Sequence, residues 1–262
     1  MGSASVQGPL WGARAHDWAS LAEPAQTPFY EEVFDVVKVR PDTRLLDVGC
    51  GAGLALVLAH QRGATVTGLD ASEDLIAIAR HRLTDADLRV GDLEELPFPD
   101  HAFTTVTSFN AVQYATDPTR ALRELSRVAE RGAPIAIVTW GDPSRSEMRD
   151  VLAAIGGLLP PPPPGAGGPF ALSRPGALEE LVATAGLQPE QTGEVPTPYI
   201  YPDVTTAVQA QSSSGPAVRA ANHAGPDALR TTLTDVLAGY RQPDGTVRLD
   251  NVFRYIVATT PV

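Results

Sequence analysis

Short apolar runs alternate with longer amphipathic segments between about residue 44 and residue 140. Each run is rich in Leu, Val, Ile or Thr and ends near Gly, Asp or Asn, which predicts a strand. The predicted strands are TRLLDVGC, ATVTGLD, DLRVGD, AFTTVTSFN and APIAIVTW. Between them, LALVLAHQRG, SEDLIAIARHRL and DPTRALRELSRVAER predict helices, the last two beginning at Ser72 and Asp117. Because strands alternate with helices, we expect a doubly wound, mostly parallel Rossmann-like α/β sheet.

The segments on either side of this block have a different pattern. Residues 11–38 predict one or two helices, and residues 202–240 predict Ala-rich helices broken by Gly-Pro at 215 and 225. At the carboxyl end, NVFRYIVATT predicts one more strand. We therefore divide the chain into an N-terminal helical segment (1–40), an α/β core (41–140), a helical and Pro/Gly-rich insertion (141–250) and a final core strand (251–262).

Composition restricts the classes of partner. The 262 residues carry a net charge of −11 and no run of Lys or Arg, which argues against nucleic acid as a ligand. A single cysteine, Cys50, excludes an internal disulfide framework and fits a reducing cytosol. The N-terminus lacks the pattern of a signal peptide, and no apolar run approaches the ~20 residues of a membrane span. We expect a cytoplasmic protein that does not engage a membrane, as a monomer or homodimer.

A glycine-rich stretch follows the first predicted strand. It reads Gly49-Cys50-Gly51-Ala52-Gly53 and leads into a predicted helix, where backbone N–H groups can receive a carboxylate or another anion. The dinucleotide fingerprint G-x-G-x-x-G would need glycine where Leu54 stands, and the Lys-Ser/Thr ending of a P-loop is absent. A tight strand–helix turn without a ligand is the alternative interpretation.

Two acids follow at the ends of the next two strands. Asp70 lies 17 positions after Gly53 and can accept hydrogen bonds from both hydroxyls of a ribose. Asp92 can accept from the amino group of a purine, while Leu93 donates its backbone N–H. Alternatively, Asp70 caps a helix and Asp92 is a solvated loop acid.

These motifs resemble those of class I S-adenosylmethionine (SAM)-dependent methyltransferases, in their small-molecule, ubiquinone-biosynthesis-like branch. The resemblance covers roughly residues 40–140 and includes LLDVGCGAG, GLDAS, GDLEELPFPDHAF and FNAVQYATDPTRALRELSRV. It implies SAM as cofactor, S-adenosylhomocysteine as product, and a seven-stranded sheet whose last strand, NVFRYIVATT, is antiparallel.

The resemblance also implies roles for individual residues. The methionine end of the cofactor would be held by Asp47, Gly49, Gly51 and Gly53, the ribose by Asp70, the adenine by Asp92 and Leu93, and the methionine amino group by the backbone of Asn110. Cys50 and Ala71 lie within the same motifs, and we include them among the cofactor contacts. Two departures concern loop geometry: Phe103-Thr104 replaces the usual Phe-Asp, and Arg131-Gly132-Ala133-Pro134 replaces the usual Pro-Gly-Gly.

Methyl transfer requires alignment of its reactants, and positioning alone can contribute ~7–11 kcal/mol. An acceptor with a high pKa also needs a base within hydrogen-bond reach. The candidates for that base are His16, Tyr114 and His223, with His101 a weaker one. Arg14, His16 and Trp18 could line the cofactor end of the pocket, and Trp11 with Trp18 could wall it or make cation–π contacts. Core packing of Trp11, Trp18 and Tyr114, and a surface position for His223, are the alternatives.

The insertion is where the resemblance places acceptor recognition. Its low charge, its prolines and its aromatic residues Phe170, Tyr199 and Tyr201 suggest a small apolar or aromatic acceptor, methylated on O, N or C. The Pro/Gly-rich residues 160–169 are either a lid or a plain linker. Two other functions stay open: a SAM-binding protein with a different reaction or none, and an NAD(P)-dependent reductase, against which Leu54 and Asp92 argue.

Overall fold

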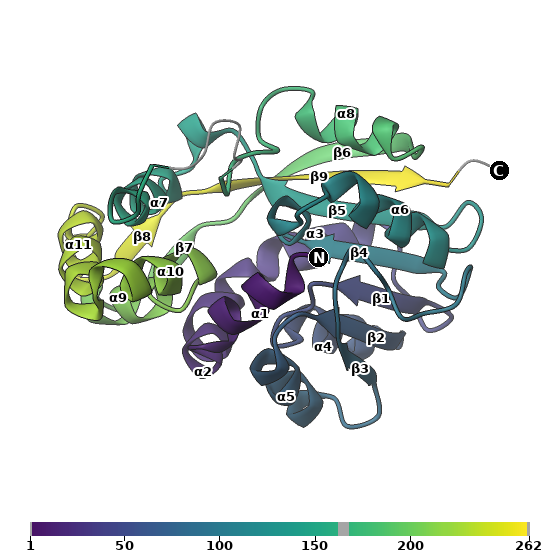
Figure 1. The fold of residues 1–262 in the computed structure, drawn as a ribbon, viewed down its shortest axis with the longest axis horizontal. Coiled ribbons are helices and arrows are strands. Elements are labelled where there is room, and N and C mark those ends of the chain that lie inside the picture. Colours follow the sequence, from purple (N-terminus) through teal and green to yellow (C-terminus); the bar gives the residue numbers. More distant parts are fainter. Residues whose placement is uncertain (1, 162–167, 261–262) are drawn as a thin grey trace.

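A seven-stranded sheet forms the centre of the molecule (Figure 1). The computed structural model describes residues 2–161 and 168–260. The strand order is β3-β2-β1-β4-β5-β9-β6, and only β9 runs antiparallel to its neighbours. The strands are β1 (Arg44–Val48), β2 (Thr65–Asp70), β3 (Asp87–Val90), β4 (Thr105–Phe109), β5 (Pro134–Trp140), β6 (Gln188–Pro196) and β9 (Val252–Thr259). The expected fold, with NVFRYIVATT as the antiparallel strand, is confirmed.

Helices cover both faces of this sheet, which explains why β1, β4 and β5 are buried at nearly every position. On one face lie α3 (Thr27–Val36), α4 (Leu54–Gln61) and α5 (Glu73–Arg82). On the other lie α6 (Pro118–Val128) and α8 (Ala177–Thr184). The two helices predicted from their caps begin as expected: Ser72 accepts from the N–H of Leu75 (3.2 Å), and Asp117 accepts from that of Arg120 (3.0 Å).

A group of helices lies beyond the carboxyl ends of the parallel strands. In it, α11 (Pro226–Ala238) packs against α7 (Met148–Gly157), α9 (Val204–Gln211) and α10 (Gly215–Ala224). Helices α10 and α11 begin at the two predicted Gly-Pro breaks. A two-stranded sheet of β7 (Tyr199–Tyr201) and β8 (Val247–Leu249) connects the group to β9.

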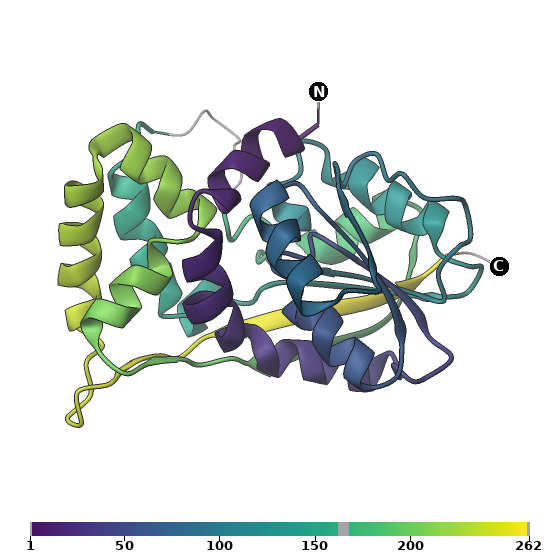
Figure 2. The ribbon, with the colours of Figure 1, turned by 90° about the horizontal axis from the view of Figure 1, so that it is seen from below.

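The N-terminal segment lies between this helical group and the sheet (Figures 1 and 2). It consists of α1 (Ala4–Gly12), α2 (Ala15–Asp17), a π-helical turn (Trp18–Ala22) and a 3-10 turn (Glu23–Gln26) that leads into α3. Helix α1 packs against both α10 and α5, so this segment bridges the two parts of the molecule.

The position of β6 corrects the prediction for residues 141–250, which we expected to form a helical and Pro/Gly-rich insertion. That range supplies an edge strand of the core sheet in addition to helices. The strand was not predicted because QPEQTGEVP is polar and mostly exposed, and its register shifts between Pro189 and Gln191. Residues 162–167, the centre of the suggested lid or linker, lie outside the described residues. Across the described ranges, no helix has both the length and the apolar character needed to cross a membrane.

Phe29 joins the N-terminal segment to the sheet. Its side chain is fully buried, and its ring centroid lies 4.5 Å from that of Phe253 in β9 and 6.0 Å from that of Phe109 in β4. We expect Phe29→Ala to lower the free energy of unfolding by about 3–5 kcal/mol, because it leaves a cavity at this junction. Equilibrium denaturation in urea measures the change. The control Val6→Ala alters an exposed side chain of α1 and should change stability by less than about 0.5 kcal/mol. Equal effects of the two substitutions would contradict this packing.

Candidate functional site

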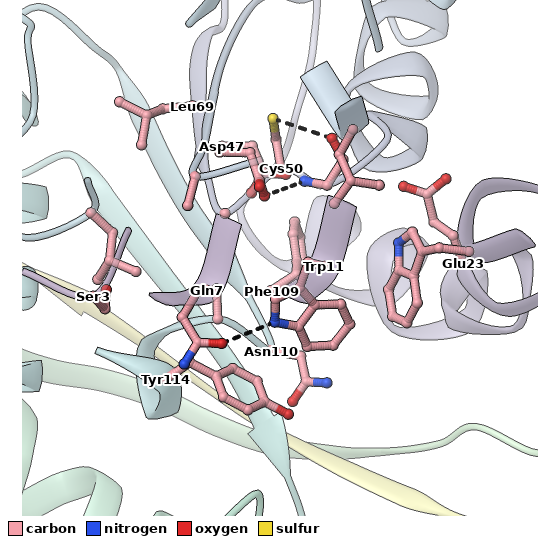
Figure 3. Close-up of a pocket in the computed structure, with 18 of the residues that line it drawn as sticks. Ser3, Gln7, Trp11, Glu23, Asp47, Cys50, Leu69, Phe109, Asn110 and Tyr114 are labelled. Atoms are coloured by element: carbon pink, nitrogen blue, oxygen red, sulfur yellow. Dashed lines mark hydrogen bonds between the residues drawn. The ribbon is translucent and has the colours of Figure 1, made fainter. Parts of the chain in front are cut away.

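The carboxyl ends of β1, β2 and β4 meet the N-terminal segment around a pocket that encloses about 800 Å³, including open solvent at its mouth (Figure 3). We call it the glycine-loop pocket. The predicted site residues that line it are Trp18, Asp47, Gly49, Cys50, Gly51, Asp70, Ala71, Leu93, Asn110 and Tyr114. Ser3, Gln7, Trp11, Glu23, Gln26 and Tyr30 line it as well, and of these only Trp11 was expected.

The loop after β1 is folded back over β2 by its own backbone. The N–H groups of Gly49 and Cys50 both donate to the Leu69 carbonyl, at 2.7 and 3.0 Å. Gly49 has φ +81°, and a Cβ there would lie 2.4 Å from the Cβ of Ala111, so no other residue fits. Burial raises the pKa of the Cys50 thiol well above its usual range, so this side chain stays neutral beneath the loop.

The third glycine of the motif has a structural role. Gly53 begins α4 in the left-handed region, with φ +83°. A Cβ there would lie 2.9 Å from the Cβ of Ala79 in α5. Gly53 is therefore not among the residues that line the pocket, although it sets the direction in which α4 leaves the loop.

Asp70 ties the loop to the end of β2. One carboxylate oxygen accepts from the N–H of Gly51 (2.9 Å), and the other accepts from the N–H of Ser72 (2.8 Å). Burial raises the pKa of this carboxyl, and the two backbone hydrogen bonds lower it in part. Each carboxylate oxygen has a further lone pair, which leaves Asp70 able to accept from two hydroxyls of a ligand.

Asp47 is buried at the end of β1, where its Oδ1 accepts from the Thr107 hydroxyl (2.8 Å). Burial raises the pKa of Asp47 to about 7, with a further contribution from the charges of Asp70 and Glu23. These three groups belong to residues that line the pocket, and Glu23 pairs with the guanidinium of Arg82. No Lys, Arg or His is among the described residues that line the pocket. The site is suited to a ligand that carries positive charge.

Asp92 is placed differently from the expectation. Its carboxylate accepts from the N–H groups of Ala4 (3.0 Å) and Glu94 (2.9 Å) and does not line the pocket, whereas Leu93 does. Glu94 in turn accepts from the N–H of Ser3 at 3.2 Å. The two acids therefore satisfy N–H groups at the start of α1 and stabilise its dipole. An adenine amino group would share the Asp92 carboxylate with this helix.

Glu23 anchors the other end of the N-terminal segment. It is 1% exposed, accepts from the N–H of Leu54 at the start of α4 (3.3 Å), and forms an ion pair with Arg82 of α5. Arg82 also donates to the carbonyls of Ala52 (2.8 Å) and Ala19 (2.9 Å). Sequence reasoning missed Glu23 because a single acid in LAEPAQ belongs to no recognisable pattern.

Asn110 ends β4 in the left-handed region, with φ +53°. A residue other than glycine there costs of order 1–3 kcal/mol, and such positions cluster at functional sites. Its backbone carbonyl accepts from the Gln113 side chain (3.1 Å) and retains a lone pair for a second donor. Asn110 thus lines the pocket, and its contact with a methionine amino group stays a prediction.

A second cavity adjoins the first, with about 440 Å³ of empty space that includes open solvent at its mouth. We call it the aromatic chamber. Five residues line both cavities: Trp11, Trp18, Gln26, Asn110 and Tyr114. The remaining walls come from the N-terminal segment, β5, β7 and the helical group: Ala22, Trp140, Met148, Leu152, Tyr199, Gln211, Ser214 and Pro216. No Asp, Glu, Lys, Arg or His occurs among the described residues that line it.

Aromatic contacts give the chamber its walls. The ring centroid of Trp11 lies 4.8 Å from that of Trp18 and 5.6 Å from that of Tyr114, both edge to face. The ring centroids of Trp140 and Tyr199 are 6.2 Å apart. Burial raises the pKa of both tyrosine phenols well above their usual range. At neutral pH these phenols are therefore protonated, and they act as hydrogen-bond donors rather than as bases.

The structure does not bring the predicted histidines to either cavity. His16 is exposed because Ala15 and Ala19 take the buried face of their turns, and with Arg14 it lines a separate surface groove beside α5. Arg14 pairs with Asp17 (2.6 Å) instead of facing the pocket.

His223, near the end of α10, and His101, whose ring contacts the Ala129 carbonyl, are also exposed.

The two departures from the family pattern lie at the amino ends of β4 and β5, whereas the pocket lies at the carboxyl ends of the strands. At the amino ends, Thr104 Oγ1 accepts from the N–H of Arg44 (2.8 Å), and the N–H of Gly132 donates to Thr260 (3.0 Å). Neither position is part of either cavity.

A methyltransferase-domain family model matches residues 46–137. A malonyl-[acyl-carrier protein] O-methyltransferase of Serratia marcescens is 32% identical over 145 residues, which cover 55% of this chain and 57% of that protein. A demethylmenaquinone methyltransferase of Listeria monocytogenes serotype 4a is 33% identical over 132 residues, which cover 47% of this chain and 56% of that protein. The chain thus spans little more than half the length of these relatives.

The fold is also found in a solved structure. A geranyl diphosphate C-methyltransferase of Streptomyces coelicolor A3(2), in complex with S-adenosylhomocysteine, superposes with a TM-score of 0.54 at 18% identity over 90% of this chain and 79% of that one. These matches decide against the alternative of an NAD(P)-dependent reductase. Residues 46–137 thus match a methyltransferase domain, and the sheet around them has the strand arrangement that the resemblance to class I SAM-dependent methyltransferases implies.

Proposed function

We propose that this chain transfers the methyl group of SAM to an O, N or C nucleophile of a small apolar or aromatic molecule held in the aromatic chamber. The observation that carries the proposal is that the two cavities adjoin, since they share five lining residues. A donor in the glycine-loop pocket and an acceptor in the chamber would meet beside Trp18, Asn110 and Tyr114.

The residues of the glycine-loop pocket fit SAM by their chemistry. Asp70 can accept from the ribose hydroxyls, Leu93 lies where adenine would pack, and the Asn110 carbonyl can accept from the methionine amino group. The buried acids Glu23, Asp47 and Asp70 favour a cation. When bound, SAM supplies a methyl group on a positively charged sulfur.

The protein's own contribution to the reaction is positioning and exclusion of water. Trp11 and Trp18 line both cavities, and their rings can help to position the reactants and attract a positive charge. Because His16 and His223 are exposed and Tyr114 is protonated, none of the three base candidates is placed or charged to take a proton from an acceptor.

The first test is binding of SAM by calorimetry, followed by a search for methylated product with a panel of aromatic hydroxy and amino compounds. We expect Asp70→Ala to weaken SAM binding by about 10–100-fold, because it removes charge-assisted hydrogen bonds to the ribose and frees the Gly51 N–H. His16→Ala, an exposed control, should bind SAM as wild type does and retain activity. Failure of the wild-type protein to bind SAM would overturn the proposal. Binding without any methylated product would favour a SAM-binding protein with another reaction.

SAM affinity should depend on pH through Asp47. Its carboxyl, with a pKa of about 7, is increasingly protonated below that pH and ionised above it. A positively charged ligand binds better beside the ionised form, so the association constant should rise with pH, by up to about tenfold per unit below pH 7. Asp47→Asn keeps an oxygen for the Thr107 hydroxyl and should flatten this dependence. Identical pH profiles of the variant and the wild type would assign the titration to another group, such as Glu23 or Asp70.

A further inference from the structure

We propose, building on the proposed function, that the aromatic chamber takes its acceptor as an oxygen anion, a phenolate or enolate that has already lost its proton to water. The enzyme would then select an acidic hydroxyl compound and would not deprotonate it. The inference depends on three features: the lack of a base in the chamber, the presence of hydrogen-bond donors, and the distribution of charge between the two cavities.

A neutral hydroxyl acceptor would keep its proton in this chamber. Proton transfer needs a base within about 3 Å, directly or through one water. The part of the lining that the structure describes offers aromatic and aliphatic side chains, the amides of Gln26, Asn110 and Gln211, and one serine. Gln26 is itself engaged, because its Oε1 accepts from the Tyr30 hydroxyl at 2.8 Å. Amides are not bases at neutral pH, so the proton has no destination inside the chamber.

The chamber does offer donors to an oxygen anion. The phenols of Tyr114 and Tyr199 stay protonated, because burial raises the pKa of each. Tyr114 and Asn110, both labelled in Figure 3, each line the glycine-loop pocket and the aromatic chamber. Within the described ranges, the Tyr114 hydroxyl makes no hydrogen bond to another residue. A protonated phenol and a carboxamide N–H₂ group there can donate to a negatively charged oxygen.

The charge distribution sets an order of binding. The chamber has no cation among its described lining residues, so a buried anion needs a positive charge from elsewhere. Next to it, Glu23, Asp47 and Asp70 make the glycine-loop pocket acidic and repel an anion. A bound SAM reverses that balance. We therefore expect the acceptor to bind only after the cofactor.

The transfer is balanced without a protein base. The acceptor's proton has gone to water before binding. The carbon–sulfur bond breaks with both electrons remaining on sulfur, and the new carbon–oxygen bond forms from a lone pair of the oxygen anion. One positive and one negative charge disappear together, which leaves a neutral thioether and a neutral methyl ether, or a C-methylated ketone where an enolate reacts at carbon. No side chain of the chamber changes its protonation state.

The test uses 4-nitrophenol as the probe, because its phenolate and phenol forms absorb differently. Its binding is measured by difference spectroscopy with two inert cofactor analogues: sinefungin, which carries an ammonium in place of the sulfonium, and S-adenosylhomocysteine, which has a neutral sulfur. We expect a phenolate spectrum for the bound probe, at least about tenfold tighter binding with sinefungin, and no detectable binding without an analogue.

Matched tyrosine variants localise the effect. Tyr114→Phe should weaken phenolate binding by about 10-fold or more, because a hydrogen bond to a charged group is lost. Tyr240→Phe is the control, since the Tyr240 hydroxyl donates to Asp150 (2.7 Å) outside both cavities, and it should leave probe binding unchanged. Equal effects of the two variants would mean that the Tyr114 phenol does not hold the anion.

Three results would overturn the inference while SAM binding stands: a bound probe in its phenol form, equal affinity with the two analogues, or tighter binding of the neutral amine 4-nitroaniline. The last would assign the chamber to an amine acceptor, which needs no prior ionisation. SAM binding, measured first by calorimetry, keeps the two proposals apart. If SAM itself does not bind, the proposed function fails and this inference fails with it.

Discussion

The site depends on one backbone arrangement, in which the N–H groups of Gly49 and Cys50 donate to the Leu69 carbonyl. These hydrogen bonds fold the loop after β1 over the end of β2, and the Asp70 carboxylate holds it there through the N–H of Gly51. The close approach to Ala111 permits only glycine at position 49. Because the fold brings the ends of β1, β2 and β4 together at this loop, every other feature of the glycine-loop pocket is placed relative to it.

The N-terminal segment completes the site and divides it into two cavities. Carboxylates fix both of its ends: Asp92 and Glu94 hold the start of α1, and Glu23 joins the segment to α4 and to Arg82 of α5. Between these anchors, Trp11 and Trp18 stand at the boundary of pocket and chamber. The acidic side chains line the glycine-loop pocket, while the described lining of the aromatic chamber is neutral and largely aromatic or aliphatic. On the proposed function, a positively charged cofactor would link the two cavities electrostatically.

Much of this could be predicted from the sequence, because the relevant signals are local. Strand–helix alternation predicted the sheet, and Ser72 and Asp117 predicted two helix starts. The residues at the strand ends predicted part of the pocket lining. The failures concern long-range packing. Strand β6 is a polar edge strand that owes its place to β9, and His16 points outward because its neighbours Ala15 and Ala19 are buried. The chamber could not be found in the same way, since Trp140, Tyr199 and Gln211 come from segments far apart in the sequence.

The central claim is that the glycine-loop pocket is the binding site of a nucleoside that carries an amino-acid tail. The most direct measurement is a crystal structure of the protein grown with S-adenosylhomocysteine. The account predicts ribose hydroxyls on the Asp70 carboxylate, adenine against Leu93, and the methionine end beside Asp47 and Asn110, with the sulfur facing the aromatic chamber. Density for the ligand at another site, or an empty pocket still closed by Trp11 and Trp18 at saturating ligand, would contradict it.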